Sequence, residues 1–217
     1  MFPMSRESLQ NRKTRMFRII SILKSEYPNS KCSLVYESPF QLLVATILSA
    51  QCTDERVNKV TSKIFPIYPD ACSFSKLTAT EIGKMIYSTG FYNNKSKNIK
   101  AMSDIVARDY SGEIPGNIDL LVKLPGVGRK TANVVLGNIF NIPSLVVDTH
   151  VTRITNLLKF TKSRNAVIIE KELNKVVESK DWSIFAHLLI DHGRKICIAN
   201  RPQCSSCSLI DFCPSSH

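Results

Sequence analysis

The sequence lacks the features that would place the protein in a membrane, a secretory route or a β-rich fold. No apolar run approaches the roughly 18–20 residues that a membrane-spanning helix needs. The first residues carry positive charge without an apolar stretch, so we expect no secretory signal and a cytoplasmic location. Hairpin turn patterns, series of alternating strands, internal repeats and low-complexity tracts are also absent. The composition therefore favours a soluble, all-α protein.

Acidic residues are scarce: 18 Asp and Glu stand against 29 Lys and Arg, which gives a formal net charge of +11. An excess of positive charge is typical of proteins that bind a polyanion such as nucleic acid. A basic but merely solvated surface is the alternative, and charge alone does not decide between them. Hydrophobic residues make up 43% of the 217 residues, enough for the core of one large or two small domains.

Disulfide bonds are not expected, because the cysteine count of seven is odd and no secretory signal is visible. Three cysteines are scattered, whereas the other four follow a C-x6-C-x2-C-x5-C pattern near the C-terminus: Cys197, Cys204, Cys207 and Cys213. Four cysteines so close together indicate a metal site. Their spacing alone leaves both zinc and an iron–sulfur cluster open.

A glycine-containing turn joins two segments with helical periodicity in the middle of the chain. Residues 117–123 form the first segment, and Pro125 ends it. Gly126 and Gly128 follow, and both tolerate positive φ angles. Residues 129–139 form the second helix, with apolar residues on one face. The amides of such a turn and the positive end of the second helix suit a phosphate group, although an ordinary turn without a ligand is the alternative.

Helical periodicity and capping residues cover most of the remaining chain. The other predicted helices are residues 12–26, a buried helix opened by Ser38, an amphipathic helix capped by Thr53, a helix opened by the pair Thr78 and Glu81, a basic helix from Asn93 or Asn94 to Tyr110, a helix around residues 151–158, and helices at 165–178 and 182–191.

Three motifs in the order LPGVGRKTANVVL, VDTH at residues 147–150 and the four cysteines resemble the endonuclease III family of DNA glycosylases. The resemblance covers about residues 16–213. It implies two α-helical domains with the active cleft between them. One is a helical bundle at 31–142 with a helix-hairpin-helix at about 117–139. The other combines 1–30 with 143–217 and carries a [4Fe–4S] cluster on the four cysteines, instead of the zinc ion that the spacing alone also allows.

The resemblance also implies catalytic roles for Lys130 and Asp148. Taken alone, the lysine would be a phosphate clamp or a solvated side chain, and the aspartate an N-cap. Lysine is nucleophilic only as the free amine, and the positive end of a helix together with Arg129 disfavours the ammonium form. An amine that attacks C1′ of a deoxynucleoside can release the base, form a Schiff base and allow β-elimination. Asp148 would assist through its negative charge.

Further residues would contact DNA if the resemblance holds. Gln51 matches the family residue that fills the gap left by a flipped base, and a polar cap is its alternative role. Phe91 lies where the family commonly has a leucine wedge, and a core aromatic is the alternative. Lys95 is predicted to bind a backbone phosphate. The predicted hairpin contacts are Gly126, Val127, Gly128 and Arg129.

The sequence therefore predicts a bifunctional DNA glycosylase and AP lyase of base excision repair. Its expected substrate is double-stranded DNA with oxidised pyrimidines or abasic sites, and we expect a monomer, associated with the nucleoid if the cell is bacterial. Two alternatives remain at this point. A monofunctional glycosylase for another lesion would form no imine, and a non-enzymatic helix-hairpin-helix protein would bind duplex DNA with a steep salt dependence and leave the sugar intact.

Overall fold

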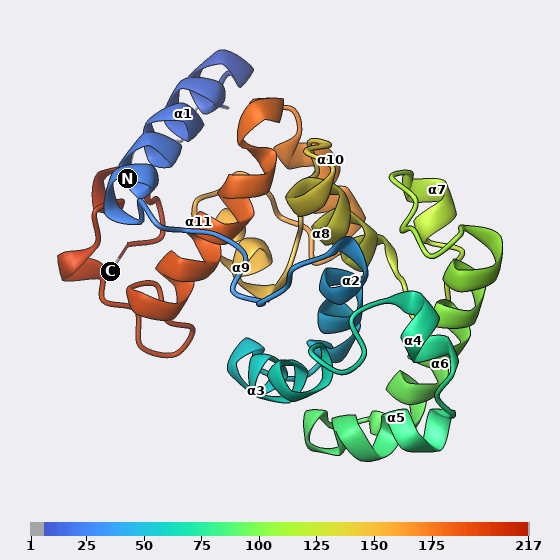
Figure 1. The fold of residues 1–217 in the computed structure, drawn as a ribbon. Helices are drawn as coiled ribbons and strands as arrows, with labels where there is room; N and C mark the ends of the chain where they lie inside the picture. Colours follow the sequence, from blue (N-terminus) through green and yellow to red (C-terminus); the bar gives the residue numbers. More distant parts are fainter. Residues whose placement is uncertain (1–6, 217) are drawn as a thin grey trace. The chain divides into compact units, whose positions relative to one another are not determined.

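The computed structural model describes residues 7–216, and within that range all regular structure is helical (Figure 1). The prediction of an all-α fold is confirmed. The chain divides into two compact units. Residues 32–142 form the hairpin unit, and the residues up to 31 together with those from 143 onward form the cysteine unit. No helix in the described range is long and apolar enough to cross a membrane.

The hairpin unit is built around α2, a helix whose residues are all buried apart from the first. It packs against α3, α6 and α8. The elements of this unit are α2 (Pro39–Leu48), α3 (Asp54–Ile64), α4 (Ala71–Ser75), α5 (Ala79–Ile86), η1 (Tyr87–Thr89), α6 (Tyr92–Asp109), α7 (Ile118–Leu121) and α8 (Arg129–Ile139). A helix that is apolar on every side must be covered by its neighbours, which explains why α2 lies at the centre.

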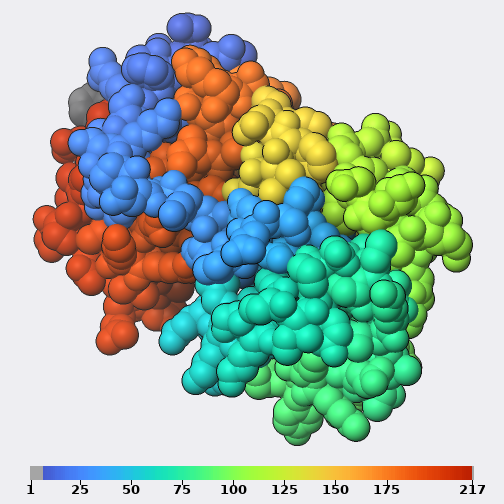
Figure 2. Space-filling model, viewed as in Figure 1, coloured from blue at the N-terminus to red at the C-terminus, as the bar shows by residue number. Residues whose placement is uncertain are grey.

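The cysteine unit has its own apolar core, formed largely by α1, α9 and α11. Its elements are α1 (Leu9–Glu26), α9 (Thr149–Leu157), α10 (Ala166–Leu173), η2 (Ser179–Asp181), α11 (Trp182–Lys195), η3 (Cys204–Ser206) and η4 (Ile210–Phe212). Figure 2 shows the first and last segments of this unit, coloured blue and red, lying against each other. The two ends of the chain therefore build one unit around the cysteine segment.

Several helix boundaries differ from the predicted ones, and side-chain caps explain two of the differences, at α1 and α4. The first helix begins at Leu9, because Ser8 accepts a hydrogen bond from the amide of Asn11. The basic helix α6 begins at Tyr92. Helix α4 was not predicted, and it is opened by a reciprocal cap between Asp70 and Ser73. Helix α10 ends at Leu173, earlier than predicted, and α11 continues beyond residue 191 to Lys195.

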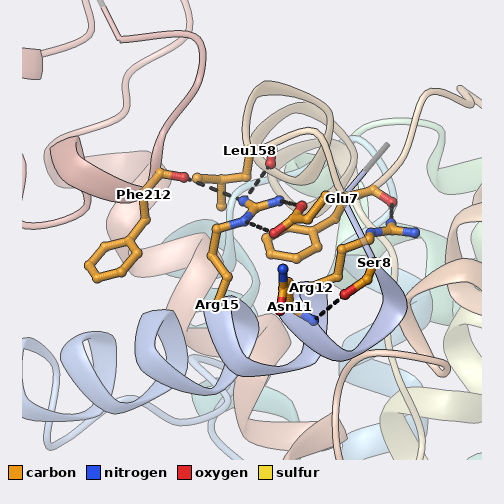
Figure 3. A network of polar contacts seen from close by, with 8 residues as sticks. Glu7, Ser8, Asn11, Arg12, Arg15, Leu158 and Phe212 are labelled. Atoms are coloured by element: carbon orange, nitrogen blue, oxygen red, sulfur yellow. Dashed lines mark hydrogen bonds and ion pairs between the residues drawn. The ribbon is translucent and has the colours of Figure 1, made fainter. Parts of the chain in front are cut away.

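Arg15 ties α1 to the segment that carries the last cysteine (Figure 3). Its guanidinium forms a two-pronged ion pair with Glu7, at 3.0 and 2.8 Å. It also donates to the carbonyl of Leu158 at 2.8 Å and to that of Phe212 at 3.4 Å. The same group lies 4.0 Å from the centre of the Phe160 ring. Because Phe212 directly precedes Cys213, this network holds one end of the cysteine segment against α1.

We expect Arg15→Ala to lower the free energy of unfolding by about 2–3 kcal/mol, because the carboxylate and two carbonyls would lose a charged donor. Arg15→Lys should recover only part of the loss, since an ammonium cannot form the forked pair. Urea denaturation measures both. Arg18→Ala, which removes an exposed arginine from the same helix, is the control. Equal stability of the Arg15→Ala and Arg18→Ala proteins would show that the contacts of Arg15 do not stabilise the fold.

Candidate active site

The hairpin turn gives its two glycines different tasks. Gly126 has a φ of +77°, and a Cβ atom there would lie 2.8 Å from Cβ of Asn98 in α6. Gly126 is therefore required both for backbone conformation and for close packing. Gly128 has a φ of −84° and therefore does not use the positive φ that a glycine tolerates. It is the N-cap of α8, and a Cβ atom there would meet no atom within 4 Å.

Helix α8 begins with Arg129 and Lys130, both exposed, and no side chain caps its first turn. The first amides of a helix have no partner within the helix, and together with the macrodipole they attract an anion. The open space at Gly128 leaves this end of α8 accessible. Lys130 is thus an exposed amine at a helix end suited to bind phosphate.

Val127 does not fit its predicted role in DNA contact. Its side chain is buried in the core of the hairpin unit, and only 5% of its surface is exposed. Its amide donates to the carbonyl of Leu124 at 3.1 Å and is not available to a phosphate. The structure therefore gives Val127 a packing role inside the turn.

Asp148 belongs to the cysteine unit, where it is the N-cap of α9. Its Oδ1 accepts a hydrogen bond from the amide of Val151 at 2.8 Å. The residue is partly exposed. The capping role that the residue pattern favours is present, and it leaves the charge of the carboxylate available for chemistry.

Gln51 and Phe91 lie at the tips of two exposed loops of the hairpin unit. Both adopt the left-handed backbone region, with φ angles of 54° and 49°. The region is uncommon for residues other than glycine and marks positions that the surrounding structure holds in place. The side chain of Phe91 is 62% exposed, which rules out the alternative of a core aromatic. These features are compatible with the predicted insertion into DNA.

The structure contradicts the predicted role of Lys95. Only 5% of its surface is exposed, although it lies near the start of the basic helix. Its ammonium donates to two backbone carbonyls, those of Leu48 and Thr89, each at 2.8 Å. Burial lowers the pKa of Lys95. A phosphate on the surface cannot reach this ammonium, so the predicted contact with the DNA backbone is wrong.

The four C-terminal cysteines line one cavity of about 270 Å³ in the cysteine unit. None of the seven cysteines of the chain forms a disulfide bond. In the described residues, no group of three or more His, Cys, Asp or Glu side chains is arranged to hold a single metal ion. The four cysteines thus share one cavity, and their thiolates are a donor set that can bind a metal centre.

Polar groups next to the cysteines were not predicted as part of this site. Arg153 donates to the sulfur of Cys197 at 3.3 Å, and Nε2 of His192 lies 3.6 Å from the sulfur of Cys207. Nδ1 of His192 is in turn 3.2 Å from the hydroxyl of Tyr27. Burial raises the pKa of the Cys197 thiol, and the hydrogen bond from Arg153 opposes that effect. Hydrogen bonds of this kind stabilise thiolates that bind a metal centre.

Comparisons with known proteins agree with these features. Residues 44–179 match the HhH-GPD superfamily of base excision DNA repair proteins. Endonuclease III of a Synechocystis species is 47% identical over 209 residues, which cover 96% of this chain and 95% of that protein.

Two solved structures, each 40% identical, have the same fold. A non-covalent endonuclease III–DNA complex aligns with a TM-score of 0.89 over 94% of this chain and 96% of the other. A trapped endonuclease III–DNA covalent intermediate, an estranged-adenine complex, aligns with a TM-score of 0.88 over the same shares of the two chains. The chain therefore belongs to the endonuclease III family, within the HhH-GPD superfamily of base excision DNA repair proteins.

Proposed function

We propose that this enzyme, a DNA N-glycosylase with AP lyase activity, acts on oxidised pyrimidines in duplex DNA through Lys130 and Asp148. The observation that carries the proposal is the position of Lys130, an exposed amine on the open first turn of α8, directly after the hairpin. The structural similarity to a trapped covalent endonuclease III intermediate supports an amine nucleophile. A monofunctional glycosylase would not need a lysine there.

In the proposed reaction the free amine of Lys130 attacks C1′, and the bond from C1′ to the base breaks. The base leaves with the electron pair of that bond and takes up a proton. The sugar ring then opens, with O4′ protonated, and a Schiff base joins C1′ to the lysine nitrogen. The Schiff base acidifies the C2′ proton. Loss of this proton forms a double bond between C2′ and C3′ and expels the 3′ phosphate, and hydrolysis of the imine restores the lysine.

Asp148 supplies negative charge to the developing positive charge on the sugar and can accept a proton from the attacking amine. Its capping bond to Val151 fixes the direction of the carboxylate. The positive end of the helix dipole at the start of α9 interacts favourably with the carboxylate. Asp148 therefore acts as an anion whose position is fixed by the start of α9.

The hairpin unit supplies the DNA contacts. The turn at Gly126 and Gly128 and the first turn of α8 with Arg129 bind a backbone phosphate. Gln51 fills the gap left by the flipped nucleotide, and Phe91 wedges between bases on the other strand. The protein acts as a monomer in the cytoplasm, associated with the nucleoid in a bacterial cell.

Substitution of the two glycines should separate folding from DNA binding. Gly126→Ala is expected to cost about 1–3 kcal/mol of stability, because alanine is strained at positive φ and would also crowd Asn98. Gly128→Ala should cost under about 1 kcal/mol. Its methyl group would stand where the phosphate binds, so duplex affinity should fall about tenfold. Thermal unfolding and fluorescence-anisotropy titration measure the two effects, and unchanged affinity for Gly128→Ala would exclude the phosphate site.

The four cysteines hold a [4Fe–4S] cluster in this proposal. The donor set, the cavity that all four line and the hydrogen bond from Arg153 fit such a cluster. When bound, it would supply cross-links among Cys197, Cys204, Cys207 and Cys213, which lie in a segment with little regular structure. Arg15 and His192 hold that segment from the protein side. The proposed role is structural.

The test uses the intact wild-type protein with duplexes that carry one thymine glycol, one abasic site or one uracil. We expect release of thymine glycol, strand cleavage at the abasic site, and a protein–DNA cross-link when borohydride reduces the Schiff base. Base release without a cross-link would show a monofunctional glycosylase. Binding without release or cleavage would show a non-enzymatic DNA-binding protein, and efficient release of uracil alone would overturn the proposed substrate class.

A further inference from the structure

Lys95 lies between the two loops that are proposed to enter the duplex. Its ammonium donates to the carbonyl of Leu48, the last residue of α2, immediately before the loop with Gln51. It also donates to the carbonyl of Thr89, the last residue of η1, which is followed by Gly90 and Phe91. Both distances are 2.8 Å. A single buried ammonium group thus links the residue before the Gln51 loop to the residue before Gly90 and Phe91.

The energetics explain why an ammonium suits this position. Helix ends expose carbonyls without intrahelical partners, and they carry partial negative charge. Lys95 satisfies one such carbonyl at the end of α2 and another at the end of η1. An unpaired buried charge would be costly, so the ammonium is stable only while the carbonyls of Leu48 and Thr89 both stay within hydrogen-bond distance. The lowered pKa of Lys95 agrees with this burial.

The hydrogen bonds inside each loop do not connect one loop to the other. In residues 49–53 the bonds are local, as from the amide of Cys52 to the carbonyl of Ser49. In residues 87–91 they are also local, as from the amide of Gly90 to the carbonyl of Tyr87. Each loop has one residue in the left-handed backbone region, Gln51 and Phe91. Among the hydrogen bonds described for these two segments, those of Lys95 connect the start of one loop, at Leu48, to the other, at Thr89.

We propose that Lys95 is a positioning residue that fixes the separation of the Gln51 and Phe91 loops, so that both side chains enter the duplex together. This inference rests on the proposed insertion of Gln51 and Phe91 into DNA. Extrusion of a nucleotide costs unstacking energy and leaves a gap in the duplex. Two side chains that enter the duplex on either strand can offset this cost together only if their loops are held at a fixed separation. Loss of the link leaves each loop folded and separates their positions.

The consequence should depend on the substrate. Excision of thymine glycol requires extrusion of a stacked base, and a displacement of about 1 Å in a positioning element can cost about 100-fold in rate. An abasic site has no base to unstack, so the same displacement should matter much less for Schiff-base formation there. A general loss of structure would lower both reactions equally. The ratio of excision to cross-linking therefore separates positioning from folding.

The experiment compares the wild type with Lys95→Met, Lys95→Arg and a control, Lys97→Met, which removes an exposed lysine from the same helix. Three quantities are measured under single-turnover conditions: excision of thymine glycol, borohydride cross-linking at a preformed abasic site, and the fluorescence of 2-aminopurine next to the lesion as a report of flipping. Urea denaturation of each variant monitors the fold.

For Lys95→Met we expect excision to fall about 10- to 100-fold with a weaker 2-aminopurine signal, while cross-linking at the abasic site changes less than about threefold. Lys95→Arg keeps the charge and donors and should recover part of the excision rate. Lys97→Met should change each rate less than about threefold. An unchanged ratio of excision to cross-linking in Lys95→Met, or full 2-aminopurine signal, would overturn the positioning role.

If Lys95→Met does not fold, Lys95→Arg decides the question, because its longer, planar group fits the two carbonyls less well and should still lower the ratio. A wild-type ratio in a folded Lys95→Arg protein would then overturn the inference. Failure of the proposed function has a different signature: the wild-type protein itself would neither excise thymine glycol nor form the cross-link. The two failures are therefore distinguishable.

Discussion

Lys130→Gln is expected to abolish the borohydride cross-link and to slow strand cleavage on the order of 10⁴-fold or more, the scale on which loss of a nucleophile acts. Glutamine has similar length and no amine, so the Schiff base cannot form. In the described part of the chain, the side chain of Lys130 makes no hydrogen bond or ion pair, and it is exposed. The fold and the duplex affinity should therefore remain close to those of the wild type.

The matched control is Lys123→Gln, which removes another exposed lysine shortly before the hairpin. It lowers the net charge by the same amount, so any loss of activity due to charge alone should appear in both variants. Denaturing gels measure the cross-link, and anisotropy titrations at several salt concentrations measure affinity. A persistent cross-link in Lys130→Gln would assign the nucleophile to a different amine, and loss of duplex binding would make Lys130 a phosphate contact.

Sequence reasoning located helices well where a capping residue precedes a clear apolar period. Helix α8 begins and ends at the predicted residues, Arg129 and Ile139, and the predicted caps Ser38, Thr53 and Thr78 all accept the expected amides. Helix α4 was missed because its length of 5 residues gives too few positions for a period to show. Helix ends were less accurate, since continuation past a residue depends on contacts that the local sequence does not contain.

Predictions for single residues of the candidate site have the same limit, because they too depend on contacts that the local sequence does not contain. The sequence pattern favoured an N-cap role for Asp148, and the structure confirms it. For Phe91 the pattern alone allowed a core aromatic, whereas the family resemblance placed it in a loop, where it is exposed. The prediction failed for Lys95, because a lysine on a basic helix has no local signal that tells burial from exposure. The carbonyl of Leu48 that turns Lys95 inward belongs to a residue 47 positions away. Val127 failed similarly, since its burial depends on the helices packed around the turn.

The hydrogen-bond partners of the cysteines could not be predicted from the sequence for a related reason. The local spacing of the cysteines indicates that they are metal ligands. Arg153, which donates to Cys197, lies 44 residues from it, and His192, which lies 15 residues from Cys207, contacts Tyr27 at a separation of 165 residues. Contacts at such separations are set by how α1, α9 and α11 pack, which one sequence does not specify.

Asp148→Asn should separate the structural from the chemical task of this residue. Asparagine is as good an N-cap as aspartate, so the bond to the amide of Val151 should persist and stability should change by less than about 0.5 kcal/mol. The amide carries no charge and cannot accept a proton from the amine. Base excision and cross-linking should fall about 10²- to 10⁴-fold, the contribution typical of a positioned acid or base.

Asp148→Ala provides the comparison, because it removes both the charge and the cap. It should lose about 1 kcal/mol of stability in addition to the activity. Single-turnover excision and urea denaturation, measured on the same preparations, give both quantities. If Asp148→Asn retained full activity while Asp148→Ala lost it, the carboxylate would be needed only to start α9. If both lose activity and only the alanine variant loses stability, the charge itself must act on the sugar, because the helix start is then the same in the wild type and the asparagine variant.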